Sequence, residues 1–242
     1  MKWLLHVLMF FYRPFFILLV AVDTTILGII VIILSYFDPN GNRVHYIGKF
    51  WSRMNLFFSG VRVRLKGMEN IELEKPYVVM SNHQSHYDVW TLIGYLPLQL
   101  RWVMKKELRR VPIFGLGCER MGHIYIDRKN PDQSHKELEA ARKKFEAGSS
   151  VVFFPEGTRS PDGTLLPFKK GGFVMALQHG LPILPITVNG TRKILPKGTM
   201  RVMPGVVDVI IHPPISTAGY TLERKEELME KTRLVIQSGK RD

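Results

Sequence analysis

The stretch SNHQSHYDVW (residues 81–90) carries two histidines and an aspartate directly after the apolar run of residues 77–80. His83 and Asp88 are five positions apart, which places them about 140° apart on a helix and on opposite faces of a strand. A strand followed by a helix would instead leave His83 in the connecting loop, folded back toward Asp88. The carboxylate could then orient the imidazole and leave its other nitrogen free as a general base.

The same residues permit other roles. Ser85 to Asp88 also fits a capping box, in which Asp88 caps a helix and His83 is an ordinary loop residue. His83, His86 and Asp88 are residue types that could bind zinc or iron, although no further ligands cluster nearby. Ser85 is a weak nucleophile candidate because no G-x-S-x-G elbow surrounds it. From these residues alone, catalysis, capping and metal binding all stay open.

A second polar turn follows the apolar run of VVFFPEGTRS (residues 151–160). Gly157 permits a tight backbone approach. Arg159 offers a planar fork of donors that matches a phosphate or a carboxylate. Glu156 could bind a hydroxyl or hold a cation, and an internal Glu156–Arg159 pair on a surface turn is the simpler alternative. The turn is therefore a candidate anion site.

Two further basic residues follow expected strands. Lys105 stands nearest the strand end in RWVMKKELRR, and Arg128 ends HIYIDR. A solvated charged face is the simpler interpretation of the first run. However, ligands of open α/β sheets bind outside the carboxyl ends of the strands, where His83 and Arg159 would also lie. That convergence favours one shared site.

Strands and helices alternate from residue 61, which predicts an α/β domain with a largely parallel sheet covered by helices. We expect an anchoring segment over residues 1–59 and the α/β domain over residues 60–242. An amphipathic helix is expected at 43–59, facing either the core or a membrane interface. The expected strands are 61–65, 77–80, 101–104, 123–126, 151–154, 183–188 and 206–211, and the expected helices are 88–98, 132–147, 173–179 and 222–236. Residues 108–121 are expected to be helical or irregular around Pro112.

The first 37 residues are almost wholly apolar, with Arg13, Pro14 and Asp23 as the main interruptions. One helix from about residue 15 to 37 could span a bilayer, but it would bury Asp23 in hydrocarbon. Two helices broken near Asp23-Thr24-Thr25 could instead dip into one leaflet, and we favour this hairpin. Basic residues on both sides leave the orientation bias weak.

The composition restricts the kinds of molecule that could bind this protein. The net charge of +13 calls for a negatively charged partner,. The apolar N-terminus favours a membrane, and we expect no nucleic acid. Cys118 is the single cysteine of the sequence, which excludes an internal disulfide and makes a thiolate metal cluster implausible,.

Four blocks in order resemble the glycerolipid acyltransferases, specifically bacterial 1-acylglycerol-3-phosphate acyltransferases. Asn82-His83 with Asp88 matches their N-H-x-x-x-x-D block, and the later blocks are MGHIYIDR, FPEGTRS and LPILPI. The resemblance covers about residues 60 to 200. The second block is the loosest match, because His123 and Tyr125 stand where more apolar residues are expected.

The resemblance implies that His83 takes a proton from the free hydroxyl of lysophosphatidic acid as it attacks an acyl thioester, while Asp88 supports the imidazolium. The other implied roles are phosphate binding by Arg159, Lys105 and Arg128, and an acceptor pocket shaped by Asn82, Glu156, Gly157 and Thr158. It also implies a co-substrate acyl-CoA or acyl carrier protein thioester, with no metal or other cofactor. The implied location is the cytoplasmic face of the cell inner membrane.

Two alternatives remain at this point. One keeps the chemistry and changes the acceptor to glycerol-3-phosphate or another lysophospholipid. The other is a noncatalytic lipid-binding protein, which the intact histidine–aspartate block disfavours.

Overall fold

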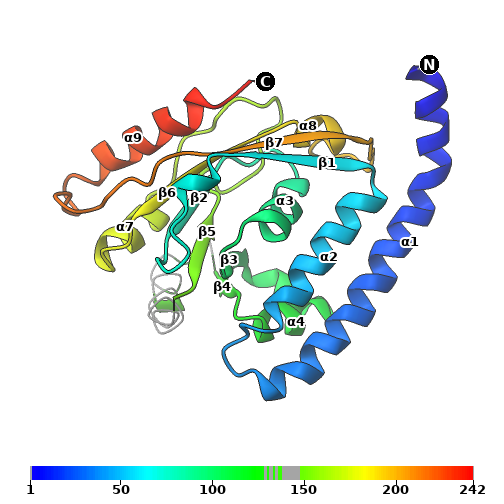
Figure 1. The fold of residues 1–242 in the computed structure, drawn as a ribbon, viewed down its shortest axis with the longest axis horizontal. Helices are drawn as coiled ribbons and strands as arrows, with labels where there is room; N and C mark the ends of the chain where they lie inside the picture. The colour runs from blue at the N-terminus through cyan, green and yellow to red at the C-terminus, as the bar shows by residue number, and fades with distance from the viewer. Residues whose placement is uncertain (1, 128–129, 131–132, 134–135, 138–147, 242) are drawn as a thin grey trace.

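The computed structural model describes residues 2–127, 130, 133, 136–137 and 148–241. Their helices lie on both sides of a central sheet (Figure 1). One face is covered by α7 (Gly171–Gln178) and α9 (Lys225–Ser238). The other face is covered by α3 (Tyr87–Tyr95), with α2 (His45–Phe58) and α1 (Lys2–Leu34) beyond it. This arrangement confirms the predicted α/β class.

The sheet brings three loops to one edge. Within the described residues its strand order is β1-β7-β6-β2-β5-β3-β4, and the β6–β7 pair is antiparallel whereas the other neighbours are parallel. Because β2, β5 and β3 are parallel neighbours, the segments that follow them leave the same edge. The strands are β1 (Val61–Lys66), β2 (Val78–Ser81), β3 (Leu100–Lys105), β4 (Ile124–Ile126), β5 (Ser150–Phe153), β6 (Ile183–Asn189) and β7 (Gly205–Ile211).

The central strand β2 is buried at all four positions, as expected of a parallel strand that helices cover on both faces. Val78 pairs in register with Val151 of β5 and Ile183 of β6. The remaining short helices of the described chain are η1 (Ser35–Phe37), η2 (Met68–Asn70), η3 (Lys106–Arg110), α4 (Phe114–Arg120) and α8 (Thr191–Ile194).

The predicted break near Asp23 is wrong, because α1 runs through it as one helix. Asp23 is only 9% exposed, and its Oδ1 accepts a hydrogen bond from the Trp51 indole of α2 at 3.0 Å. Thr25 donates to the Ala21 carbonyl within the helix at 2.8 Å. Asp23 Oδ1 and the Thr25 hydroxyl therefore find partners without a break in the helix, whereas Asp23 Oδ2 is buried without a partner among the described residues.

A helical pair does form, but between α1 and α2. In the turn between them, Asp38 Oδ2 accepts hydrogen bonds from the backbone N–H groups of Arg43 (2.6 Å) and Val44 (3.0 Å). The predicted domain boundary at residues 59/60 falls between α2 and β1, and the division into two domains stays a prediction. The charged helix expected at 132–147 lies largely outside the described residues.

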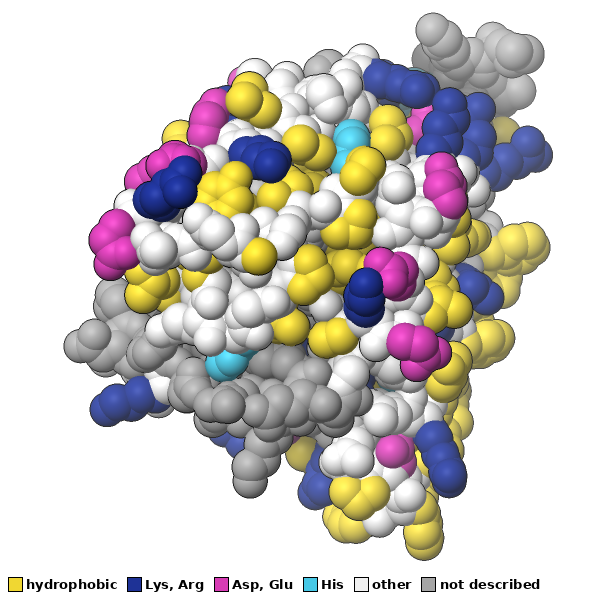
Figure 2. Space-filling view, turned by 60° about the vertical axis from the view of Figure 1, so that its left-hand side comes forward, with side chains coloured by type: hydrophobic (Ala, Val, Ile, Leu, Met, Phe, Trp, Pro, Cys, Tyr) yellow, Lys and Arg dark blue, Asp and Glu magenta, His cyan; other side chains and the backbone are white. Residues whose placement is uncertain are grey.

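Charge is not gathered into one patch on the face shown in Figure 2. There, basic and acidic side chains are interspersed with hydrophobic ones (Figure 2). The hydrophobic side chains of α1 are in contrast widely exposed, for example Phe11 at 74%.

Candidate active site

The imidazole of His83 is held from two directions in the loop after β2. Its Nδ1 lies 2.8 Å from Asp88 Oδ2. Its ring stacks on Phe154, with centroids 3.8 Å apart and planes 8° from parallel. The His83 side chain keeps 15% exposure, whereas Asp88 is fully buried. The strand–loop–helix geometry expected for this pair is thus present.

Asp88 combines two of the roles that the sequence left open. The same Oδ2 accepts hydrogen bonds from the backbone N–H groups of Gln84 (2.7 Å) and Ser85 (2.9 Å). Ser85 Oγ accepts from the Tyr87 N–H at 3.3 Å and not from the Asp88 N–H, so only the carboxylate half of the capping box is present. An oxygen that already accepts from two backbone N–H groups also acts as an acceptor toward the imidazole. Nδ1 is therefore the protonated nitrogen, and Nε2 remains as the basic one.

The second polar turn follows β5 and is tight. Phe154 C=O accepts a hydrogen bond from the Gly157 N–H at 2.9 Å. Gly157 has φ +70°, and a Cβ there would lie 2.8 Å from the Lys169 side chain. Both constraints favour glycine. The turn carries Thr158 and Arg159 toward the loop of His83.

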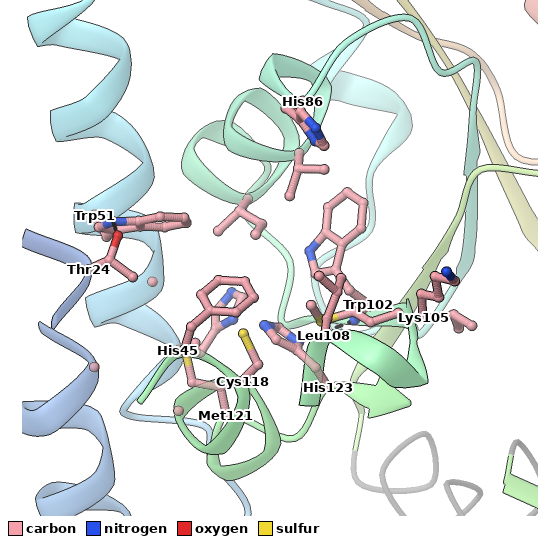
Figure 3. Close-up of a pocket in the computed structure, with 18 of the residues that line it drawn as sticks. Thr24, His45, Trp51, His86, Trp102, Lys105, Leu108, Cys118, Met121 and His123 are labelled. Atoms are coloured by element: carbon pink, nitrogen blue, oxygen red, sulfur yellow. Dashed lines mark hydrogen bonds between the residues drawn. The ribbon is translucent and has the colours of Figure 1, made fainter. Parts of the chain in front are cut away.

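The two turns share one cavity of about 420 Å³. Figure 3 shows His86 and Lys105 at separate edges of it, and His45, Cys118, Met121 and His123 gathered near α4. Its polar end is lined by His83, His86, Lys105, Gly157, Thr158 and Arg159, and its largely apolar end by Leu27, Gly28, Val31, Ile47, Gly48, Trp51, Leu108, Phe114, Gly117, Cys118 and Met121. The cavity is thus lined by cationic side chains together with many apolar ones.

Five predicted site residues line this cavity: His83, Lys105, Gly157, Thr158 and Arg159. Lys105 Nζ also lies 3.2 Å from Glu107 Oε1. Arg128 lies outside the described residues, so its predicted phosphate contact stays a prediction.

Asn82 and Glu156 lie behind the cavity wall. The Asn82 amide exchanges two hydrogen bonds of 2.8 Å with the backbone of Val188. Glu156 is 3% exposed, and its carboxylate accepts from the backbone N–H groups of His83 and Leu166. They can therefore shape the predicted acceptor pocket only through the backbone that they hold.

Three residues that contribute to the site were not predicted from the sequence to do so in this way. Phe154 had no signal beyond its place in an apolar run. Lys197, whose Nζ donates to the Arg159 carbonyl at 2.7 Å, comes from a distant segment. His86 lines the cavity, and its pKa is lowered by burial and by the positive charge of Arg159. His86 is therefore a neutral donor or acceptor at the cavity mouth at neutral pH.

Within the described residues, no group of three or more His, Cys, Asp or Glu side chains is arranged to hold a metal ion. The polar end has the parts for base-assisted attack by an anionic alcohol: an oriented imidazole, a guanidinium and an ammonium group.

Comparison with known proteins places this geometry in a family. Residues 62–189 match the family model described as Acyltransferase. The chloroplastic 1-acyl-sn-glycerol-3-phosphate acyltransferase of Arabidopsis thaliana is 36% identical over 83% of this chain. The chain spans only 58% of the length of that relative. The 1-acyl-sn-glycerol-3-phosphate acyltransferase of Pseudomonas aeruginosa is 33% identical over 84% of this chain and 80% of its own length.

A solved structure extends the likeness to the whole fold. The crystal structure of the 1-acyl-sn-glycerophosphate acyltransferase of Thermotoga maritima matches with a TM-score of 0.83 and 27% identity. That match covers 99% of this chain and 96% of the other. The resemblance drawn from the four motifs is confirmed at the level of the family, and the chain belongs to the acyltransferase family.

Proposed function

We propose that this protein transfers a fatty acyl group from an acyl thioester to the free sn-2 hydroxyl of 1-acylglycerol-3-phosphate, giving phosphatidic acid. The observation that carries the proposal is the shared cavity, which is lined by the Asp88-oriented His83, by Arg159 and by many apolar side chains. An acceptor with a hydroxyl, a phosphate and an acyl chain presents one group for each feature.

In this mechanism His83 Nε2 accepts the proton of the sn-2 hydroxyl while its oxygen attacks the thioester carbonyl. Asp88 stabilises the imidazolium that forms. The tetrahedral intermediate then collapses, the carbon–sulfur bond breaks, and the thiolate takes the proton from His83. A positioned base contributes roughly 10²–10⁴ in rate.

Arg159 and Lys105 are proposed to bind the acceptor phosphate at the cavity mouth, joined by Arg128. The thioester is carried by coenzyme A or by acyl carrier protein. Because the thioester is already activated, positioning can supply much of the remaining rate. We therefore propose a reaction without a metal or other cofactor.

We further propose that α1 and α2 lie in one leaflet at the cytoplasmic face of the inner membrane. One helix, His6–Phe37, is long and apolar enough to cross a bilayer. However, α1 contacts the rest of the protein along its length: Tyr12 donates to the Phe58 carbonyl, and Gly28 packs against α4. A perpendicular span would draw the packed domain into hydrocarbon. Phe11 (74% exposed) and Phe57 (77% exposed) would enter the lipid instead,.

Purified full-length protein assayed with a matrix of radiolabelled acyl donors and acceptors, read by thin-layer chromatography, tests the proposal. The acceptors are 1-acylglycerol-3-phosphate, glycerol-3-phosphate and a zwitterionic lysophospholipid. We expect phosphatidic acid as the main product. Preferential transfer to either other acceptor would replace the proposed substrate, and binding without turnover to any acceptor would leave a lipid-binding protein.

A further inference from the structure

Both backbone polar groups of His83, its N–H and its C=O, form hydrogen bonds to the turn that carries Arg159. Its N–H donates to Glu156 Oε1 at 2.6 Å, and its C=O accepts from the Ser160 N–H at 2.8 Å. Glu156 and Ser160 flank Arg159 in the sequence. The base and the guanidinium therefore belong to one hydrogen-bonded unit, although 76 positions of sequence separate them.

Glu156 extends that unit to a third segment. Its Oε2 accepts from the Leu166 N–H at 2.9 Å, so the two oxygens of one carboxylate bond two backbone donors. The side chain is 3% exposed and is not part of the cavity wall. An acceptor in the cavity would meet Arg159 and His83, whereas Glu156 has both of its oxygens already bonded.

We propose that Glu156 is a positioning residue that fixes the His83 backbone relative to Arg159, rather than a residue that contacts the acceptor. This inference rests on the proposed function, because it assigns His83 the role of base. Only a carboxylate offers acceptors at both oxygens. A glutamine would present an N–H₂ group to one of the two backbone donors and lose that bond. A small displacement of a base can cost about 10²-fold in rate.

The two hydrogen bonds that the Glu156 carboxylate accepts from His83 and Leu166, here called the brace, are sensitive to pH because of their electrostatic surroundings. Burial raises the pKa of Glu156 to about 7, and the negative charge of Asp88 acts in the same direction. The bonds from Leu166 and His83 and the positive charge of Lys240 oppose that rise in pKa. A proton on either oxygen would face a backbone N–H and remove one acceptor. The brace is thus complete only above about pH 7.

The test compares Glu156→Gln with wild type and with Asp162→Asn, a carboxylate-to-amide change in the same turn. Asp162 Oδ1 accepts hydrogen bonds from Thr164 and Ser160 side chains, which an asparagine oxygen can retain. Backbone hydrogen–deuterium exchange is measured in peptides that contain His83 and Leu166. We expect exchange to rise at least tenfold in one of these two peptides in Glu156→Gln, the one whose backbone N–H loses its acceptor, and to stay at the wild-type rate in both peptides in Asp162→Asn. Unchanged exchange in Glu156→Gln would refute the brace, whatever reaction the protein catalyses.

Kinetics then separate positioning from contact. With an acceptor that wild type turns over, Glu156→Gln should lower kcat about 10- to 100-fold and leave the acceptor KM within a few fold. Wild-type kcat should fall as the pH drops through about 7, where Glu156 takes up a proton, and the variant, which has no carboxylate at this position, should lack that component of the fall. A raised KM with normal kcat would show that Glu156 contacts the acceptor. If Glu156→Gln does not fold, Glu156→Asp, which keeps both oxygens on a side chain one methylene shorter, supplies the same comparison.

Discussion

The two ends of the cavity are built by different means. At the polar end, a hydrogen bond within one loop holds His83 against Asp88, and hydrogen bonds between distant segments join that loop to the turn of Arg159. At the apolar end, α1, α2 and α4 meet through small residues and side-chain packing. Gly117, for example, lies so close to Gly28 that an added Cβ would be 3.7 Å from the Gly28 Cα.

The hydrogen-bonded end suits the chemical step, and the packed end suits the fit of the substrate's alkyl chain. Reacting atoms need fixed geometry, which directional hydrogen bonds provide at low reorganisation cost. An alkyl chain needs only a dry recess of suitable shape, which packing provides. Changes at one end should therefore alter rate or phosphate recognition, and changes at the other should alter chain preference or stability. Sites without shared contacts should combine additively.

The largest effect tests the hydrogen-bonded end. Asp88→Asn presents an amide to the Nδ1–H and favours the imidazole tautomer whose Nε2 is protonated and no longer basic. We expect kcat to fall roughly 10²–10⁴-fold, measured by steady-state acyl transfer. Asp208→Asn, which alters an exposed ion pair with Arg64, is the matched control and should remain near wild type. A loss below about fivefold in Asp88→Asn would remove the orienting role.

Substitutions of Arg159, also at the polar end, should change the binding of the acceptor. Arg159→Ala should raise the KM for 1-acylglycerol-3-phosphate about 10- to 100-fold, because a charge-assisted hydrogen bond is lost. Arg159→Lys keeps the charge without the planar fork and should fall between alanine and wild type. The measurement is repeated with a monoacylglycerol, which has no phosphate. An equal loss with that acceptor would show that Arg159 serves another purpose.

The apolar end should make stability depend on pH. Burial and the positive charge of Arg101 lower the pKa of His45 to about 3. The unfolded chain therefore binds a proton more readily between about pH 6.5 and 3, and stability is lost as the pH falls through that window,. From pH 7 to 5 this contributes about 2 kcal/mol.

His45→Gln should remove that contribution. Denaturant unfolding at both pH values would show a smaller loss of stability in the variant than in wild type. An equal loss in both proteins would mean that other groups, and not His45, cause the acid sensitivity.

The smallest effect concerns chain length. Gly48 of α2 lines the cavity, and a Cβ there would lie 3.1 Å from Met121 Sδ. Gly48→Leu should fill part of the recess and shift preference toward shorter chains severalfold, a methylene being worth about 0.8 kcal/mol. Gly48→Ala, which only presses on a flexible methionine, is the control. Unchanged preference in Gly48→Leu would mean that the chain lies elsewhere.

Local sequence patterns were sufficient for much of this architecture. The apolar runs at 77–80 and 151–154 predicted buried strands, and the polar residues after them predicted a shared edge. The His83–Asp88 geometry was predictable because a single loop encodes it. Asp23 misled the prediction of α1 because the partner of its Oδ1, Trp51, lies 28 positions away on another helix.

The supporting contacts could not be predicted from local pattern. Glu156 bonds the backbone of His83 across 73 positions, and Phe154 stacks on a ring from another loop. Such contacts depend on strand order, and neither residue carries a local signal for them. Side chains that hold other backbone segments are therefore the part of the site that sequence patterns reveal last.

The most direct test of the account is acyl transfer by His83→Ala in full-length protein. Its folding is checked by thermal unfolding, and its membrane binding by co-flotation with anionic vesicles. We expect that transfer to 1-acylglycerol-3-phosphate is lost while the unfolding temperature and flotation match wild type. Near-normal turnover by this folded, membrane-bound variant would contradict the assignment of His83 as the base.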